Sequence, residues 1–278
     1  MRAILTIAQL TLHEAARRRI LLAALLFGLA FLILFGVGAH FMMRDLPHRV
    51  LIDAIQRRMA VSFLTLAGLY AANFLTVMTA VLLPVDTLSG EIDSGIMQTL
   101  ASKPIRRSEI LLGKWLAFTV TVMAYLAMLA GGVLVIARAI GGSTPPDLHI
   151  GLPLMALEAL VLVTLSIAGG TRLSTVTNGV MVFGFHGIAF VGGAMEQVGT
   201  FTANDTARYV GTIASLIMPS ESLWQLAAHH MQPRIMSELQ LTPFSPVSVA
   251  SPAMVWWAVG YVLVVLAIAL RSFSRRSL

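Results

Sequence analysis

The sequence predicts an all-α, polytopic membrane protein with six transmembrane helices in a single transmembrane domain. Of its 278 residues, 57% are hydrophobic and 12% are charged, and the mean hydropathy is +0.84. A soluble domain cannot bury so much apolar surface, whereas membrane helices satisfy their own backbone hydrogen bonds inside lipid. Six apolar blocks approach or exceed the roughly 20 residues that cross a hydrocarbon core. They span residues 20–41, 61–84, 115–140, 150–170, 179–198 and 254–270.

Residues 1–19 form a separate amphipathic element before the first apolar block. Leu5, Leu12 and Ala15 fall on one helical face, and the segment ends in three consecutive arginines. This pattern is typical of an interfacial helix anchored at the cytoplasmic surface. A signal peptide also places positive charge before an apolar run. Because residues 20–41 exceed a typical signal-peptide core, we predict an uncleaved first crossing.

The basic residues predict which side of the membrane each loop faces. With the N-terminus inside, twelve of the 19 lysines and arginines fall on the inner side and seven on the outer side. Cytoplasmic loops carry the excess of positive charge, so we expect both termini and the loop 86–114 in the cytoplasm, below a plasma or inner membrane. The outer side then holds a polar loop at 40–60 and a long stretch at 199–253. Its apolar patch 209–218 is too short to cross, so we expect short helices that dip into the interface.

The loop at 86–114 has the clearest internal pattern in the chain. Its apolar residues at near-helical spacing are Ile92, Ile96, Met97 and Leu100. They predict a short amphipathic helix, which Pro104 would end because its ring disfavours the helical conformation of the preceding residue. Ser108 is then expected to cap the next helix, with Glu109 near the positive end of that helix dipole.

The spacing within this loop resembles the first cytoplasmic loop of ABC-2 type transporter permeases. Members of that family have an acidic residue followed by glycine, leucine, proline, arginine and Gly-Lys at fixed intervals. The matching residues here are Glu91, Gly95, Leu100, Pro104, Arg107, Gly113 and Lys114. The six crossings, the amphipathic N-terminus and the long outer stretch also fit the layout of the family. One departure is Ile92-Asp93, which stands where many members carry a denser acidic run.

The resemblance implies the permease subunit of an ATP-driven ABC transporter, with export the more usual direction in the family. In the family, the short helix after the second crossing is a coupling helix that sits in a groove of a separate ATPase subunit. The resemblance assigns this coupling to Glu91, Ile92, Gly95, Ile96, Leu100, Pro104, Arg107 and Lys114. It also implies a dimer with a second permease chain, identical or different, and two ATPase copies. Those ATPases would bind ATP and magnesium, so no cofactor is expected in this chain.

Motifs for other functions are absent from the sequence or incomplete. Gly113-Lys114 is followed by Trp115, so the chain lacks the Gly-Lys-Ser/Thr of a P-loop. With no cysteine, disulfides and thiolate catalysis are excluded. His229-His230 lacks a convincing third ligand, so no metal site is expected. The basic residues lie at the ends of apolar blocks, which indicates membrane topology and not nucleic-acid binding.

Glu158 and His186 lie inside apolar blocks, where ionisable groups are costly and often functional. They could line a substrate route, pair with each other, or form a single interhelical hydrogen bond. The main hypothesis is a permease without a catalytic site of its own. Two alternatives stay open at this point. One is a non-transporting membrane anchor or regulator of an ATPase, and the other is an intramembrane enzyme that uses Glu158 and His186.

Overall fold

The computed structural model describes residues 2–44, 52–85, 90, 106–142, 144–233 and 248–275, and no strand occurs among them. The helices are α1 (Arg2–Arg17), α2 (Arg19–Arg44), α3 (Ile52–Val85), α6 (Arg107–Gly141), α7 (Leu148–Gly170), α8 (Thr175–Phe201), α9 (Asp205–Ile217), α10 (Ser220–Met231) and α12 (Ala253–Ser274). Six of them (α2, α3, α6, α7, α8 and α12) are long and apolar enough to cross a membrane. The predicted fold class is therefore confirmed.

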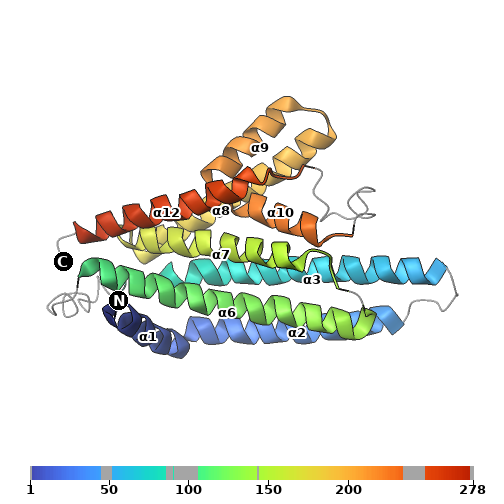
Figure 1. The fold of residues 1–278 in the computed structure, drawn as a ribbon, viewed down its shortest axis with the longest axis horizontal. Coiled ribbons are helices and arrows are strands. Elements are labelled where there is room, and N and C mark those ends of the chain that lie inside the picture. Colours follow the sequence, from blue (N-terminus) through green and yellow to red (C-terminus); the bar gives the residue numbers. More distant parts are fainter. Residues whose placement is uncertain are drawn as a thin grey trace.

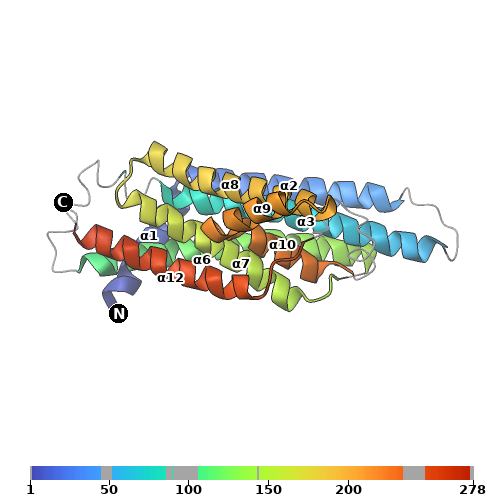
Figure 2. The same cartoon turned by 90° about the horizontal axis from the view of Figure 1, so that it is seen from above.

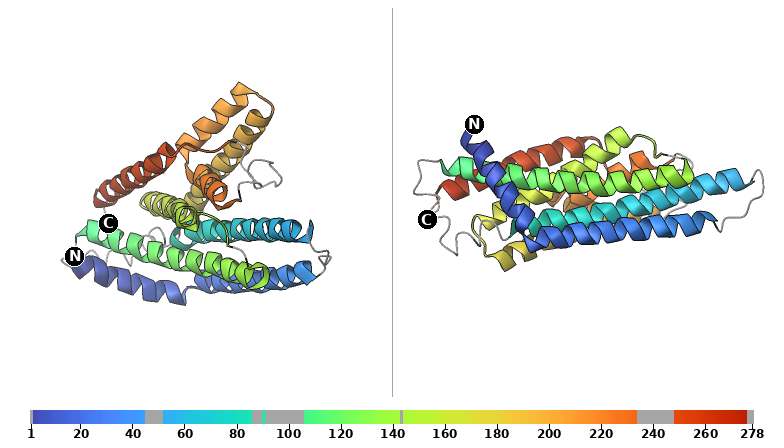
Figure 3. Two further views of the ribbon diagram at one scale, coloured as in Figure 1. Left: turned by 45° about the vertical axis from the view of Figure 1, so that its right-hand side comes forward. Right: turned by 90° about the horizontal axis from the view of Figure 1, so that it is seen from below.

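The long helices lie roughly along the longest axis of the molecule (Figures 1 and 2). α8 diverges from the others toward its C-terminal end, where it pairs with α9 (Figure 1). α1 crosses the bundle at a steep angle near one end and packs against α6 (Figure 3). The start of α6 and the end of α12 lie at this same end of the bundle (Figure 1).

α7 lies in the centre of the bundle, in contact with α3, α6, α8, α10 and α12. It is apolar on all sides, as expected of a buried helix, and Met155 and Leu162 on it are fully buried. α2 and α12 lie at the periphery and expose large apolar side chains, among them Leu26, Leu34 and Trp256. Such outward apolar surfaces suit helices that face lipid.

Side-chain hydrogen bonds join neighbouring long helices. The Trp115 indole Nε1 on α6 donates to Thr164 Oγ1 on α7 at 2.9 Å. The Tyr125 hydroxyl, also on α6, donates to the backbone carbonyl of Ala24 on α2 at 2.9 Å. Ser166 on α7 donates to a backbone carbonyl of α3 at 3.1 Å. Polar contacts of this kind fix helix pairs in a membrane, each by about 0.6 kcal/mol on average.

The loop expected at residues 40–60 is shorter in the structure than the sequence predicted. α2 continues to Arg44 and α3 begins at Ile52, so much of this range is helical. The reason is that hydropathy marks where a helix lies in hydrocarbon, whereas its backbone hydrogen bonds continue beyond that boundary.

The start of α6 also differs from its prediction. α6 begins at Arg107, with Arg106 in the N-cap position, so Ser108 lies within the first turn and is not the cap. The Glu109 carboxylate accepts a hydrogen bond from the backbone N–H of Arg106 at 3.3 Å. Glu109 therefore stabilises the helix start by reaching back to a free donor, a role that does not need a capping serine.

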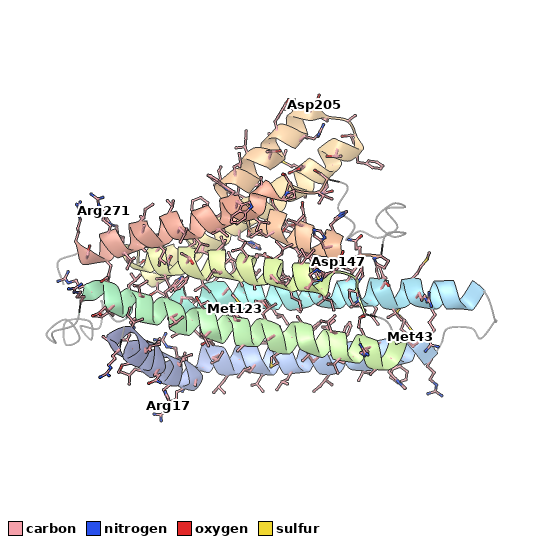
Figure 4. The ribbon with its side chains drawn as sticks, in the orientation of Figure 1. Arg17, Met43, Met123, Asp147, Asp205 and Arg271 are labelled. Carbon is pink, nitrogen blue, oxygen red and sulfur yellow. The ribbon has the colours of Figure 1, made fainter. Side chains whose placement is uncertain are left out.

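Two short helices, α9 and α10, occupy the region for which the sequence predicted short helices. α8 and α9 form a tight hairpin whose tip, near Asp205, projects away from the bundle (Figure 4). α10 instead returns to the bundle and packs against α7. Its buried residues include Leu223, Trp224 and Ala227, so this helix belongs to the core of the protein.

The α8–α9 hairpin depends on two facing glycines. A Cβ atom added to Gly211 would lie 2.6 Å from the backbone oxygen of Gly192, a distance that real Cβ atoms do not show. We therefore expect Gly211→Ala to destabilise the protein by about 1–3 kcal/mol, seen as a lower melting temperature in detergent.

The matched control for this prediction is Gly131→Ala on α6. A Cβ at Gly131 meets no atom within 4 Å, and alanine is a better helix former by about 1 kcal/mol. This variant is expected to melt at or above the native temperature. Equal melting temperatures for the Gly211→Ala variant and the native protein would contradict the close packing of the hairpin.

Candidate functional site

A cavity of about 300 Å³ lies among α3, α7, α8 and α10. Phe74 on α3 and Phe190 on α8 line it and are about half exposed, 52% and 47% respectively. The mouth of the cavity therefore opens on the face of the molecule that α3 and α8 form. Its inner wall contains Glu158 of α7, which is only 1% exposed.

α3 supplies one continuous stripe of the lining. The residues are Tyr70, Asn73, Phe74, Val77 and Met78. They follow the i, i+3, i+4, i+7, i+8 pattern of a single helical face, so the helix turns all five toward the cavity without distortion. Asn73 is the one amide in this stripe and is almost fully buried.

Asn73 supports the Glu158 carboxylate. Its Nδ2 donates to Glu158 Oε2 at 2.9 Å, which joins α3 to α7. The second oxygen, Oε1, is buried and has no hydrogen-bond partner among the described residues. A buried polar atom without a partner costs free energy, and a charged carboxylate costs more. The Glu158 side chain therefore keeps an unused acceptor beside the cavity.

α8 contributes a second stripe at helical spacing. Its lining residues are Phe183, His186, Gly187 and Phe190. A hydrogen bond of 3.0 Å joins His186 Nδ1 to Ser220 Oγ at the start of α10. Ser220 is fully buried and does not line the cavity, so a substrate in the cavity cannot reach its hydroxyl. This serine–histidine contact therefore serves packing and gives no support to nucleophilic catalysis.

α10 brings the second carboxyl group, that of Glu221, to the cavity together with Trp224. The Gln225 amide donates to Glu221 Oε1 at 3.4 Å. Burial raises the pKa of Glu221 to about 7, against the smaller opposite effect of the Gln225 hydrogen bond. The Trp224 ring packs edge-on against the Tyr70 ring, with 5.4 Å between the ring centroids, and this contact joins α10 to α3.

A polar network holds α10 in place from its outer side. Gln197 on α8 donates to Gln225 Oε1 at 3.1 Å and to the backbone oxygen of Ser248 at 2.9 Å. The Ser248 backbone N–H donates to Gln197 Oε1 at 2.9 Å, and its hydroxyl donates to Glu196 at 2.7 Å. The network joins α8, α10 and the segment before α12, so the position of Glu221 is fixed by three parts of the chain.

The sequence identified two of the polar residues in this lining and missed the others. Glu158 and His186 line the same cavity, each with a different hydrogen-bond partner. The sequence predicted no role for Asn73 or Glu221. Asn73 could have been found from its spacing between Tyr70 and Val77 on an apolar helix. Glu221 could not, because its place depends on how α10 packs into the bundle.

Most residues of the predicted coupling loop lie outside the described part of the chain. They are Glu91, Ile92, Gly95, Ile96, Leu100 and Pro104. Arg107 is partly buried at the start of α6, and Lys114, two turns later, is 3% exposed. Gly113 lies against α1, since a Cβ there would be 2.7 Å from Ile7 Cγ2. α1 thus covers the part of α6 that follows the loop.

The lining of the cavity has the composition of a binding site. Its lining is mostly aromatic and aliphatic, with a few polar groups at defined positions, which is the usual composition of a small-molecule site. Two carboxyl groups and an imidazole face this space. No serine or threonine hydroxyl is among the lining residues. The arrangement therefore favours a molecule that is largely apolar with a polar or charged group.

Comparison with known proteins agrees with the resemblance to ABC-2 permeases. The model of the family described as "ABC-2 family transporter protein" matches residues 5–278, which is nearly the whole chain. No curated protein matches the sequence. The family model covers all six potential crossings and the cavity between them. The chain therefore belongs to the ABC-2 family of transporter membrane proteins.

Proposed function

We propose that this chain is the permease subunit of an ATP-driven exporter and that its substrate passes through the cavity beside α3 and α8. The main support is that cavity, which holds ionisable groups inside a membrane bundle of the ABC-2 family. Such groups are costly in a membrane and mark substrate pathways. Since the sequence contains no P-loop, the motor is a separate ATPase that binds ATP and magnesium.

The proposed assembly contains two permease chains and two ATPase subunits. The mouth of the cavity lies on the exposed face of α3 and α8, and a second permease, identical or different, would close this face. In each permease, the loop 86–114 docks in a groove of one ATPase. Its apolar residues at helical spacing supply the contact, and the acids and bases around them set the register.

The proposed mechanism couples the ATPases to the cavity through α6. ATP draws the two ATPases together, and the coupling loops move with them. α6 begins at Arg107, within the range 86–114, and packs against α1, α3 and α7. A shift at its start therefore reaches both the interfacial helix and the walls of the cavity. The transport direction follows if ATP binds the outward-open state more tightly than the inward-open state.

The proposed orientation places both termini and the coupling loop in the cytoplasm, below the plasma or inner membrane. Arg17 and Arg271 lie toward the end of the bundle where α6 begins, whereas Met43 lies toward the other end (Figure 4). The segments that this orientation places inside hold twelve of the 19 lysines and arginines, as the positive-inside rule requires.

Native mass spectrometry tests the assembly. The permease is expressed together with candidate ABC ATPase subunits and released from detergent micelles in the spectrometer. We expect a complex of two permeases and two ATPases, with the permease expressed alone as the control. A permease that stays monomeric and binds no such ATPase would rule out the proposal. A stable complex whose ATPase activity no substrate stimulates would instead identify an anchor or regulator.

A further inference from the structure

We infer that the cavity among α3, α7, α8 and α10 binds lipophilic organic cations, such as molecules that combine aromatic rings with a quaternary or protonated amine. The claim that such cations are transported rests on the proposed function. The claim that the permease binds them can be measured on the chain alone.

The first argument is charge. Glu158 and Glu221 line one cavity, so two carboxyl groups face the same small space. Neither forms an ion pair with an arginine or lysine in the described part of the chain, and no arginine or lysine lines the cavity. The buried Oε1 of Glu158 lacks any described hydrogen-bond partner. A cation in the cavity would favour the charged form of both carboxyl groups and would interact with this oxygen.

The second argument is the aromatic lining. Five rings surround the space, those of Tyr70, Phe74, Phe183, Phe190 and Trp224. Aromatic faces attract cations, and they do so most strongly for weakly hydrated organic cations in desolvated sites. A ring face that lines the space disfavours an anion, because the face carries negative potential. A neutral ligand would leave the carboxylates without a counter-charge.

The third argument separates an organic cation from a metal ion. No group of three or more histidine, aspartate or glutamate side chains that could hold a metal occurs in the described ranges. A hard cation needs several oxygen ligands at short distance, whereas here two carboxyl groups face a mostly apolar wall. A cavity of about 300 Å³ lies at the lower end of the size range of small-molecule sites.

The position of the mouth indicates the route of entry. Phe74 and Phe190 flank it and are about half exposed on a face of the membrane bundle. A lipophilic cation partitions into membranes, so it can reach this face of a single permease from within the bilayer. In the proposed dimer it would enter between the two permeases. A strongly hydrated cation cannot follow this path, because it would have to shed its water before it reached the carboxylates.

Equilibrium dialysis of the purified permease in detergent tests the inference. The probes are radiolabelled tetraphenylphosphonium, the smaller benzyltrimethylammonium, and tetraphenylborate, which has the shape of the first with the opposite charge. We expect saturable binding of at least one cation to the native chain and no saturable binding of tetraphenylborate. This comparison needs no variant, so it does not depend on how substitutions affect folding.

Variants then locate the site. Glu158→Gln removes the charge and still offers Asn73 an acceptor, so it is expected to fold and to weaken cation binding at least tenfold. Glu221→Gln is expected to weaken it less, since Glu221 is more exposed. The matched control is Glu14→Gln on α1, outside the cavity, where the exposed carboxylate pairs with Arg18. Its affinity should equal that of the native chain.

Three results would overturn the inference: no saturable binding of either cation, equal binding of tetraphenylborate, or unchanged affinity in both the Glu158→Gln and the Glu221→Gln variants. None of these would affect the two-plus-two assembly, because the dialysis contains no ATPase. Conversely, a permease that binds cations and no ATPase would uphold this site and refute the transport function.

Discussion

Replacement of Ile96 with aspartate is expected to abolish copurification of the ATPase while the permease still folds and dimerises. Ile96 lies outside the described residues, and its role is predicted from the spacing of apolar positions in the coupling loop. If these positions fill an apolar groove of the ATPase, an unpaired carboxylate there must lose its water on docking. This costs several kcal/mol, or more than a hundredfold in affinity.

Two further variants sharpen this test. Glu91→Arg reverses a charge that we place at the rim of the contact, where solvent screens it, so it should weaken binding less than Ile96→Asp. Ile136→Leu changes the shape of a partly buried side chain on α6 at constant volume and should be nearly silent. The measurement is the amount of ATPase retained by the tagged permease. Full retention by the Ile96→Asp variant would remove the loop from the coupling mechanism.

Asn73→Leu is expected to destabilise the membrane bundle by roughly 2–3 kcal/mol. The substitution removes the donor that lies 2.9 Å from Glu158 Oε2, while Oε1 already has no described partner. The carboxyl group is then buried with neither oxygen satisfied, although leucine fills the volume of the amide. The thermal midpoint in detergent should fall by several degrees.

The double variant Asn73→Leu, Glu158→Leu is the control for this prediction. Removal of both polar partners replaces the pair by two apolar groups, which is often nearly neutral for stability. We expect the double variant to recover most of the stability lost in Asn73→Leu and to lose cation binding. Coupling between the two sites should appear as a non-additive free energy of at least 1 kcal/mol. Additive effects would mean that Asn73 does not support Glu158.

The sequence predicted the crossings well because the signal is local. A helix in lipid must be apolar along its own length, so each block of residues reveals its helix without reference to the rest of the fold. The helix ends were less accurate, as the start of α6 at Arg107 shows, because the backbone stays helical where the side chains become polar.

The residues of the candidate site also differ in whether the local sequence reveals them. Glu158 and His186 stand out in the sequence because each is ionisable within an apolar run. Glu221 lies in a stretch that mixes polar and apolar residues, where a glutamate does not by itself indicate a buried site. Only the return of α10 to the bundle, against α7, places this carboxyl beside Glu158. Contacts between segments distant in the chain set this part of the site, and no local pattern encodes them.

The length of α6 has a mechanical consequence. It is continuous from Arg107, next to the coupling loop, to Gly141 at the opposite end of the bundle, a run of 35 residues. At 1.5 Å per residue this helix measures roughly 50 Å, more than the thickness of the hydrocarbon core. As a rigid rod of that length, it turns a tilt of about 5° at one end into a displacement of roughly 4 Å at the other. If the proposed coupling acts at its start, α6 is long enough to serve as a lever arm, which makes a small angular change on one side of the membrane large enough, on the other, to move whole side chains.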